Sequence, residues 1–357
     1  MRIGIMLRLA VINALALAGT ALAEPLPAQL ADEADLVGSP DGHFVITPSN
    51  PDAATDPAAF ELNEPLTTIG ADPGLRMTMP VEIGGLGPYP FIIDTGSQRT
   101  IIATELAERL ALPPLPPVEI ISMAGRVTVS SVRLDALSFG EHAIDSLAAL
   151  TIARADMGSL GIIGLDSLED KRLTLDFGKR RMEIGKSRRP SEVRKDDDAI
   201  VVRARSKFGQ LILMNSRVDG RRVNVILDTG AEISVGNMAL FRSLKVKRLV
   251  VPPTPTTLTS VTGIAIPAQF AVVRRLTIGA ATMENVPMVF VDAAPFDELG
   301  LGDKPAMLLG MKMLRLFDRI AIDFGHRHID FHLASAAGAQ SQRLRLADSA
   351  ATDAAPR

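Results

Sequence analysis

The chain has 357 residues, of which 47% are hydrophobic and 22% charged, and its formal net charge is -3 at pH 7. This composition is typical of globular proteins rather than disordered or collagen-like ones, and the length allows two ordinary domains. A mildly acidic chain has no general attraction for nucleic acids or anionic membranes. The absence of Cys excludes disulfides, thiolate chemistry and zinc–sulfur sites.

The first 23 residues have the pattern of a secretory signal peptide. Arg2 and Arg8 give the N-terminal end a positive charge, and an apolar run covers residues 9–18. Small residues precede a cleavage site after Ala23. The apolar run is shorter than the ~20 residues of a membrane span, which disfavours the alternative of an uncleaved anchor. We therefore expect export to the periplasm, or secretion as second choice, with no stable membrane insertion after signal cleavage.

Two further segments lack the patterns of packed structure. Residues 24–75 are rich in Pro, Ala, Asp and Glu, and they predict a flexible N-terminal segment with one short strand at residues 43–47. A pro-segment or a partner-docking arm is the alternative for this segment. Residues 334–357 are mainly Ala, Ser, Gln and Arg, and they predict a disordered tail.

The central part of the chain consists of short β-type runs separated by Gly and Pro, which is typical of an all-β sandwich or barrel. A helix is expected at residues 103–110, because Leu106 and Leu110 share one face and Pro113 follows them. The strands expected in the first half cover residues 77–83, 90–93, 118–123, 127–134 and 172–177.

The second half of the central part repeats the first half in the same order. Asp94-Thr95-Gly96 recurs 134 residues later as Asp228-Thr229-Gly230, and the helix recurs at residues 238–244. Three more pairs follow with offsets that grow to 147: Ser122-Met123-Ala124-Gly125 with Ser260-Val261-Thr262-Gly263, Ile162-Ile163-Gly164-Leu165 with Leu308-Leu309-Gly310-Met311, and Leu175-Asp176-Phe177-Gly178 with Ile322-Asp323-Phe324-Gly325. This repetition predicts two duplicated lobes, at residues 76–186 and 200–333, joined by a charged linker at residues 187–199.

Each lobe carries one carboxylate, Asp94 or Asp228, between an apolar triplet and a Gly-bearing turn. Peptide hydrolysis needs a base that deprotonates water and an acid that protonates the carbonyl oxygen. Two carboxylates that share one proton provide both, because like charges about 3 Å apart cannot both ionise. Gly96 and Gly230 would let the backbone bend tightly and approach the water and the scissile carbonyl.

These motifs resemble the aspartic protease family, and more specifically the retropepsin-like bacterial aspartyl proteases fused as a tandem, from about residue 75 to residue 333. The resemblance implies an all-β protein with two duplicated β-barrel lobes and one short helix after each catalytic loop. It also implies an aspartic-type endopeptidase without cofactor or metal, whose catalytic residues are Asp94 and Asp228.

The resemblance assigns further roles residue by residue. Thr95 and Thr229 would hydrogen-bond across the lobe interface, and Gly164 and Gly310 would thread beside the catalytic loops in a ψ-shaped arrangement. The catalytic loops would be completed by Gly96, Ser97, Gly230 and Ala231. The flaps that bind substrate would be formed by Met123, Ala124 and Gly125 and by Val261, Thr262 and Gly263. Neither flap carries the Tyr that is found in pepsin-like enzymes.

The implied substrate is an extended polypeptide segment. Proteins that resemble this one process periplasmic parts of membrane proteins, so we expect a substrate of that kind, no nucleic-acid partner, and a tandem that acts as a monomer. The competing class is a catalytically silent periplasmic peptide-binding module that uses the same inter-lobe cleft. Motifs of serine hydrolases, dinucleotide-binding proteins and NTPases do not occur.

Two local features lead to further expectations. Ser97 is matched by Ala231 in the second copy, and a Ser hydroxyl can donate a hydrogen bond to the neighbouring carboxylate, so we expect Asp94 to ionise more readily than Asp228. His326, His328 and His332 occupy positions where the first lobe has Lys179, Arg180 and Met182. This match favours basic, solvent-facing residues over a metal site.

Overall fold

The computed structural model of the protein describes residues 10–11, 15–16, 70–71, 76–190 and 199–333. The expected cleavage site after Ala23, the strand expected at residues 43–47, most of the linker and the C-terminal tail lie outside the described residues. Within the described ranges, no helix has the length and hydropathy needed to cross a membrane.

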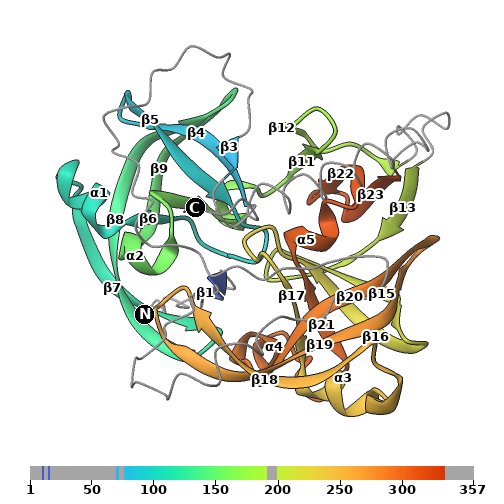
Figure 1. The fold of residues 1–357 in the computed structure, drawn as a ribbon. Helices are drawn as coiled ribbons and strands as arrows, with labels where there is room; N and C mark the ends of the chain where they lie inside the picture. Colours follow the sequence, from blue (N-terminus) through green and yellow to red (C-terminus); the bar gives the residue numbers. More distant parts are fainter. Residues whose placement is uncertain (1–9, 12–14, 17–69, 72–75, 191–198, 334–357) are drawn as a thin grey trace, which may run out of the picture. The chain divides into compact units, whose positions relative to one another are not determined.

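The first lobe is built on a β-sheet that closes on itself (Figure 1). Its strands, in sheet order, are β1 (Ala10–Val11), β7 (Pro114–Ser122), β8 (Gly125–Phe139), β9 (His142–Ile152), β6 (Ile101–Ala103), β10 (Gly161–Ile163), β5 (Leu86–Ile93), β4 (Met77–Ile83) and β3 (Gly70–Ala71). The ring closes because β4 also pairs with β8. Short helices accompany the ring: α1 (Thr104–Arg109), α2 (Arg154–Met157) and the 3-10 helix η2 (Leu165–Ser167).

The second lobe has the same construction. Its strands, in sheet order, are β14 (Arg205–Lys207), β15 (Gln210–Val218), β16 (Arg221–Leu227), β21 (Ala306–Leu309), β17 (Ser234–Asn237), β20 (Ala281–Val291), β19 (Ala265–Ile278), β18 (Val251–Ser260) and β2 (Leu15–Ala16). Here β15 also pairs with β19 and closes the ring. The helices are α3 (Met238–Ser243), η4 (Val246–Arg248), α4 (Ala294–Glu298) and α5 (Met311–Leu314).

The two rings repeat each other strand by strand, which confirms the predicted all-β, two-lobed fold. The order β8-β9-β6-β10-β5-β4 in the first lobe corresponds to β19-β20-β17-β21-β16-β15 in the second. The register repeats as well: Thr78 pairs with Ile92 in the first lobe, and Ile212 pairs with Ile226 in the second. α1 and α3 are the two expected helices, whereas α2, α4 and α5 are too short for their periodicity to be recognised in the sequence.

A third sheet joins the last hairpins of the two lobes. Its order is β12 (Arg181–Lys186), β11 (Lys171–Asp176), β22 (Phe317–Asp323), β23 (His328–Leu333) and β13 (Ala199–Arg203). β11 of the first lobe pairs with β22 of the second, so that Leu173 lies opposite Ile322. Because both side chains are buried, the seam between the lobes combines backbone hydrogen bonds with an apolar contact.

One face of this third sheet carries buried charges. Asp323, His328 and Asp330 are fully buried. Arg172 comes from the first lobe, and its Nη2 donates to Asp330 Oδ2 at 2.5 Å, while its Nη1 lies 3.2 Å from His328 Nε2. The expectation of a solvent-facing His328 was therefore wrong, because β23 places this side chain opposite Asp323 on a covered face. His326, in the preceding turn, is exposed.

Candidate active site

Asp94 and Asp228 follow the innermost strands of their lobes. β5 runs into Asp94 beside the parallel strand β10, and β16 runs into Asp228 beside β21. The N–H of Asp94 donates to Ile163 O, and the N–H of Asp228 donates to Leu309 O, both at 3.1 Å. These strands have apolar neighbours on both faces, which explains the apolar triplets in the sequence. Both carboxylates are consequently fully buried.

Each carboxylate is held by two backbone N–H groups of its own loop. The N–H groups of Gly96 and Ser97 donate to Asp94 Oδ1 at 2.7 and 3.1 Å. In the second lobe, Gly230 and Ala231 donate to Asp228 Oδ1, both at 3.0 Å. The Oδ2 atom of each Asp has no hydrogen-bond partner among the described residues. The Oδ1 atoms are thus fixed, and the Oδ2 atoms are the ones that can exchange a proton.

The threonines of the two loops connect the lobes. Thr95 Oγ1 donates to Leu227 O at 2.8 Å, and Thr229 Oγ1 donates to Ile93 O at 2.6 Å. Each acceptor is the carbonyl directly before the opposite Asp. The structure therefore places these two residues where the family resemblance implied, and they bring the two Asp-Thr-Gly loops into register.

Gly96 and Gly230 leave space for the carboxylate of the opposite lobe. A Cβ added to Gly96 would lie 2.7 Å from Asp228 Cγ, and one added to Gly230 would lie 2.3 Å from Asp94 Cγ. Neither glycine has a φ in the left-handed region. The requirement for Gly is therefore close approach of the opposing side chain, rather than the tight bend that the sequence suggested.

The electrostatics of the two carboxyl groups differ. Burial raises the pKa of Asp94, whereas the N–H groups of the loop and the positive charge of Arg76 act in the opposite direction. Burial also raises the pKa of Asp228, and the negative charge of Asp94 raises it further, to well above its ordinary value. The two carboxyl groups therefore titrate as a pair that holds one proton over a range of pH.

The Ser97 hydroxyl does not contribute to this difference. Ser97 Oγ donates to Arg99 O at 2.7 Å, in the same loop. Its backbone N–H binds Asp94 in the way that the N–H of Ala231 binds Asp228. The expected hydrogen bond from this hydroxyl to the carboxylate was wrong, because the Arg99 carbonyl accepts it instead.

Gly164 and Gly310 lie directly beside the segments that follow the two Asp-Thr-Gly loops. A Cβ added to Gly164 would lie 2.4 Å from Arg99 O, and one added to Gly310 would lie 2.6 Å from Ile233 O. The next residue after each glycine makes a backbone hydrogen bond to the same loop: Leu165 N–H donates to Ser97 O, and Met311 N–H donates to Ala231 O. The structure thus brings both glycines to the positions that the resemblance implied.

Five of the six expected flap residues lie in the turns of two hairpins, β7–β8 and β18–β19, and the sixth, Gly125, is the first residue of β8. Met123 and Val261 are buried, and Gly125 and Gly263 have φ values of +115° and +75°. Each turn begins with a serine that caps it: Ser122 Oγ accepts from Ala124 N–H and Ser260 Oγ accepts from Thr262 N–H, both at 3.2 Å. The side chains of Ala124 and Thr262 are half-buried.

Each flap hairpin meets a short helix of the opposite lobe. A Cβ added to Gly263 would lie 2.6 Å from Oδ1 of Asp156 in α2. On the other side, α4 packs against β7 and β8. These contacts tie the hairpin of each lobe to the lobe that supplies the other Asp.

Sequence reasoning missed several buried polar residues around the dyad. Arg76 directly precedes β4, whereas Gln210 is the first residue of β15. Gln210 Nε2 donates to Gly96 O across the lobes at 2.7 Å. Thr100 accepts from Gly164 N–H and donates to Asp166 Oδ1 at 2.7 Å. The signal that could have found Arg76 and Gln210 is the same offset of 134 that relates Asp94 to Asp228.

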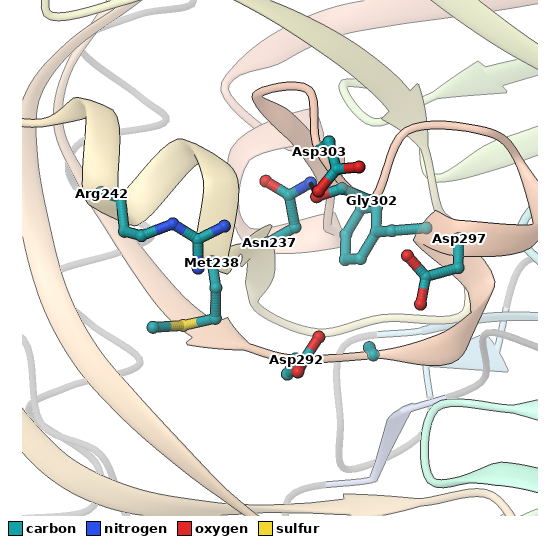
Figure 2. A pocket seen from close by; sticks show the side chains of 9 residues that line it. Asn237, Met238, Arg242, Asp292, Asp297, Gly302 and Asp303 are labelled. Atoms are coloured by element: carbon teal, nitrogen blue, oxygen red, sulfur yellow. Dashed lines mark hydrogen bonds between the residues drawn. The ribbon is translucent and has the colours of Figure 1, made fainter.

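A separate polar pocket of about 180 Å³ lies in the second lobe (Figure 2). It is lined by Asn237, Met238, Arg242, Asp292, Ala293, Phe296, Asp297, Gly302 and Asp303, none of which belongs to an Asp-Thr-Gly loop. Asn237 Nδ2 donates to Leu301 O and Lys304 O, both at 2.8 Å. Its amide therefore holds the surrounding loop, and the three Asp side chains are exposed. Among the described residues, no group of His, Asp and Glu is arranged to hold a metal ion.

Two duplicated all-β lobes that bring two Asp-Thr-Gly loops together define the class of tandem retropepsin-like proteins. The family model described as Aspartyl protease matches residues 79–167 and 214–313, which is just over half of the chain and one segment in each lobe. The chain belongs to the aspartyl protease family.

The solved structures that are similar to the chain include two with different coverage. A retropepsin-like aspartic protease from Rickettsia conorii is 20% identical, with 39% of this chain and 91% of that chain covered, and a TM-score of 0.26. Basic 7S globulin from soybean is 11% identical, with 76% and 97% covered, and a TM-score of 0.41. Among the curated proteins, none matches the chain.

Proposed function

We propose that the protein is an exported aspartic endopeptidase that hydrolyses peptide bonds of extended polypeptide segments. The observation that carries the proposal is the pair of buried carboxyl groups, Asp94 and Asp228, each fixed through Oδ1 and each with Oδ2 unpartnered among the described residues. Such a pair can act as base and acid at once, because only one of its members is ionised.

The proposed reaction uses one water molecule. Ionised Asp94 takes a proton from the water as its oxygen attacks the carbonyl carbon, and protonated Asp228 gives its proton to the carbonyl oxygen. The tetrahedral diol then collapses: its nitrogen takes the proton from Asp94, a diol hydroxyl returns a proton to Asp228, and the C–N bond breaks. The products are a carboxylic acid and an amine, and the dyad regains its starting protonation.

Substrate binding as an added strand is supported by the edges of the flap hairpins. β7 pairs with β1 through Ile120 and Ile121, and β18 pairs with β2 through Thr259 and Ser260. The outer strand of each hairpin therefore has main-chain groups that bind an extended segment. Recognition of this kind gets affinity from main-chain hydrogen bonds and specificity from alternate side chains.

The test uses the chain from residue 24 to residue 357, incubated with a peptide library between pH 4 and pH 7. Asp94→Asn and Asp228→Asn should each abolish cleavage, and a statine-type inhibitor should block the wild type. Asp135→Asn is the matched control, because Asp135 lies exposed on β8 and should tolerate the same change. Peptide binding without cleavage by the wild type would refute the enzyme and support the peptide-binding module.

The site of action is proposed from the N-terminal pattern. An exported enzyme with this signal would act in the periplasm on periplasmic parts of membrane proteins. Cell fractionation, together with mass spectrometry of the purified protein, tests this proposal: the mature chain should begin at Glu24 and be found in the periplasmic fraction. Retention of residues 1–23 in a cytoplasmic fraction would contradict it.

A further inference from the structure

Gln210 connects the second lobe to the catalytic carboxylate of the first. It is the first residue of β15 and is fully buried. Its Nε2 donates to the carbonyl oxygen of Gly96 at 2.7 Å. The N–H of the same peptide group, on Ser97, donates to Asp94 Oδ1 at 3.1 Å. A single peptide group thus links the Gln210 amide to Asp94.

A chain of hydrogen bonds through a peptide group is cooperative. A donor on the carbonyl oxygen polarises the amide, and its N–H then becomes a stronger donor, by about 10–30% for each bond. A stronger N–H donor favours the ionised form of the carboxylate that accepts it. The Gln210 amide therefore favours ionised Asp94, although it lies in the other lobe.

The carbonyl oxygen of the Gln210 side chain indicates that the position requires the Nε2 donor rather than a whole amide. Its Oε1 is buried and has no hydrogen-bond partner among the described residues. A buried acceptor without a partner is unfavourable, and an apolar side chain of similar size would avoid it. The amide is therefore explained by its bond to Gly96 rather than by packing.

The first lobe has a different residue at the equivalent position. Thr78 and Ile212 are equivalent by register, so Arg76 corresponds to Gln210. Arg76 is only 7% exposed, and its Nη1 donates to Met157 O, at the end of α2, at 3.1 Å. Burial raises the pKa of Asp94, and the positive charge of Arg76 opposes this rise. The two lobes therefore place unlike side chains, Arg76 and Gln210, at equivalent positions.

We propose that Gln210 is a positioning residue that makes Asp94 the ionised member of the dyad, acting through the Gly96–Ser97 peptide group. The inference rests on the proposed function, since it assigns the base of that reaction. It replaces Ser97 as the source of the asymmetry, because the hydroxyl of Ser97 binds Arg99 instead.

The test reads the ionisation of the dyad directly, without substrate. The side-chain carboxyl carbons of Asp are labelled with ¹³C and followed by NMR between pH 3 and pH 8, and Asp94→Asn and Asp228→Asn identify the two signals. Gln210→Met removes the donor and should raise the lower pKa of the pair by about half a unit to one unit. Gln210→Arg provides a charged donor, as at Arg76, and should lower it. Gln269→Met, the same change on β19, is the matched control.

Opposite shifts of the lower pKa in Gln210→Met and Gln210→Arg distinguish this positioning role from a purely structural role. A general loosening of the site would move the lower pKa of the pair the same way in both variants. Shifts in the same direction, or no shift in either, would overturn the proposal. If Gln210→Met does not fold, Gln210→Arg still decides, because only a lower value agrees with the proposal. Because no turnover is measured, failure to cleave any peptide would refute the proposed function and leave this result unaffected.

Discussion

Thr95 and Thr229 exchange hydrogen bonds across the two lobes: the N–H of Thr95 donates to Thr229 Oγ1 at 3.0 Å, and the N–H of Thr229 donates to Thr95 Oγ1 at 3.2 Å. Each hydroxyl also donates to a carbonyl of the opposite strand. Both hydroxyls are therefore fully used, as acceptor and as donor, in a buried environment. Because each Thr directly follows its Asp, these bonds fix the positions of the two carboxylates relative to each other.

Removal of one hydroxyl should weaken both lobes at once. In Thr95→Val, the carbonyl of Leu227 loses its donor and the N–H of Thr229 loses its acceptor, both in buried positions. We expect the free energy of unfolding to fall by about 2–4 kcal/mol. Urea unfolding of the variant, made in an Asp94→Asn background to prevent self-cleavage, measures this difference.

Two control substitutions define the specificity of that loss. Thr95→Ser keeps the hydroxyl and should retain most of the stability. Thr128→Val makes the same chemical change at an exposed position on β8 and should alter the free energy of unfolding by less than about 0.5 kcal/mol. A loss below about 1 kcal/mol for Thr95→Val would contradict the role of the threonine pair.

The raised pKa of Asp228 predicts how stability depends on pH. Burial first, and then the charge of Asp94, raise this pKa above its ordinary value of 3.8. A carboxyl group whose pKa is raised on folding stabilises the folded state below pH 3.8, and this stabilisation is lost as the pH rises through the folded pKa. The wild type should therefore be less stable at pH 7 than it would be with a neutral group in place of Asp228.

Asp228→Asn provides that neutral group. Its melting temperature should exceed that of the wild type at pH 7, and the difference should shrink as the pH falls toward 4. Thermal unfolding followed by circular dichroism at several pH values measures both curves. A constant difference across this range would show that Asp228 does not carry the expected proton.

Ser97→Ala tests whether the Ser97 hydroxyl acts on the carboxylate of Asp94. Because the Ser97 hydroxyl binds Arg99 O, its removal should leave the acidic limb of the pH dependence of kcat/KM where it is in the wild type. The variant should lose about 1 kcal/mol of stability, the usual contribution of one buried hydrogen bond. An acidic limb shifted upward would restore the interpretation in which the hydroxyl acts on Asp94.

The sequence predicts correctly those features that produce a local pattern or a repeat. An apolar triplet before Asp94 or Asp228 indicates an inner strand, and the repeated order of motifs indicates two equal lobes. Such features depend on neighbouring residues or on repeated motifs, and both are visible in the sequence itself. The helix after the first Asp-Thr-Gly loop is predicted by the helical period of its apolar residues, and the helix after the second loop is predicted by the repetition.

The features that the sequence does not predict arise where distant segments meet. Gln210 and Gly96 are 114 residues apart, and Arg172 and Asp330 are 158 apart. Nothing in the local pattern around Gln210 shows that its amide reaches the other lobe. The comparison with the first lobe predicts His328 at the surface, whereas in the structure its side chain is fully buried. Contacts of this kind follow from the packing of the lobes rather than from either lobe alone.

Arg172 supplies the positive charge in the covered face of the seam between the lobes. Its guanidinium group faces two fully buried carboxylates, Asp330 at 2.5 Å and Asp323 at 3.6 Å. If Arg172 is replaced by Met, both carboxylates stay buried without this cation. Removal of one partner of a buried ion pair costs about 3–5 kcal/mol, because an uncompensated charge is left behind. Arg172→Met should lower the free energy of unfolding by that amount at pH 7.

The same cluster should make the seam sensitive to acid. Burial lowers the pKa of His328, so its neutral form stabilises the folded state above pH 6.5, and this stabilisation is lost as the pH falls through the folded pKa. Burial alone would raise the pKa of Asp323, but the N–H of Arg188 and the hydroxyl of Ser187 outweigh it and the pKa is lowered. The ionised form of Asp323 therefore stabilises the folded state above pH 3.8, and this stabilisation is lost as the pH falls through the lowered pKa of the folded state.

Arg319→Met is the matched comparison for Arg172→Met. Arg319 lies opposite Asp176 at the other end of the same pair of strands, β11 and β22, as Arg172 lies opposite Asp323. Asp176 is partly exposed, and water can compensate its charge. Urea unfolding of the two variants at pH 7 should therefore give a loss at least about 2 kcal/mol larger for Arg172→Met. Equal losses would mean that the buried charges do not distinguish the two ends of the seam.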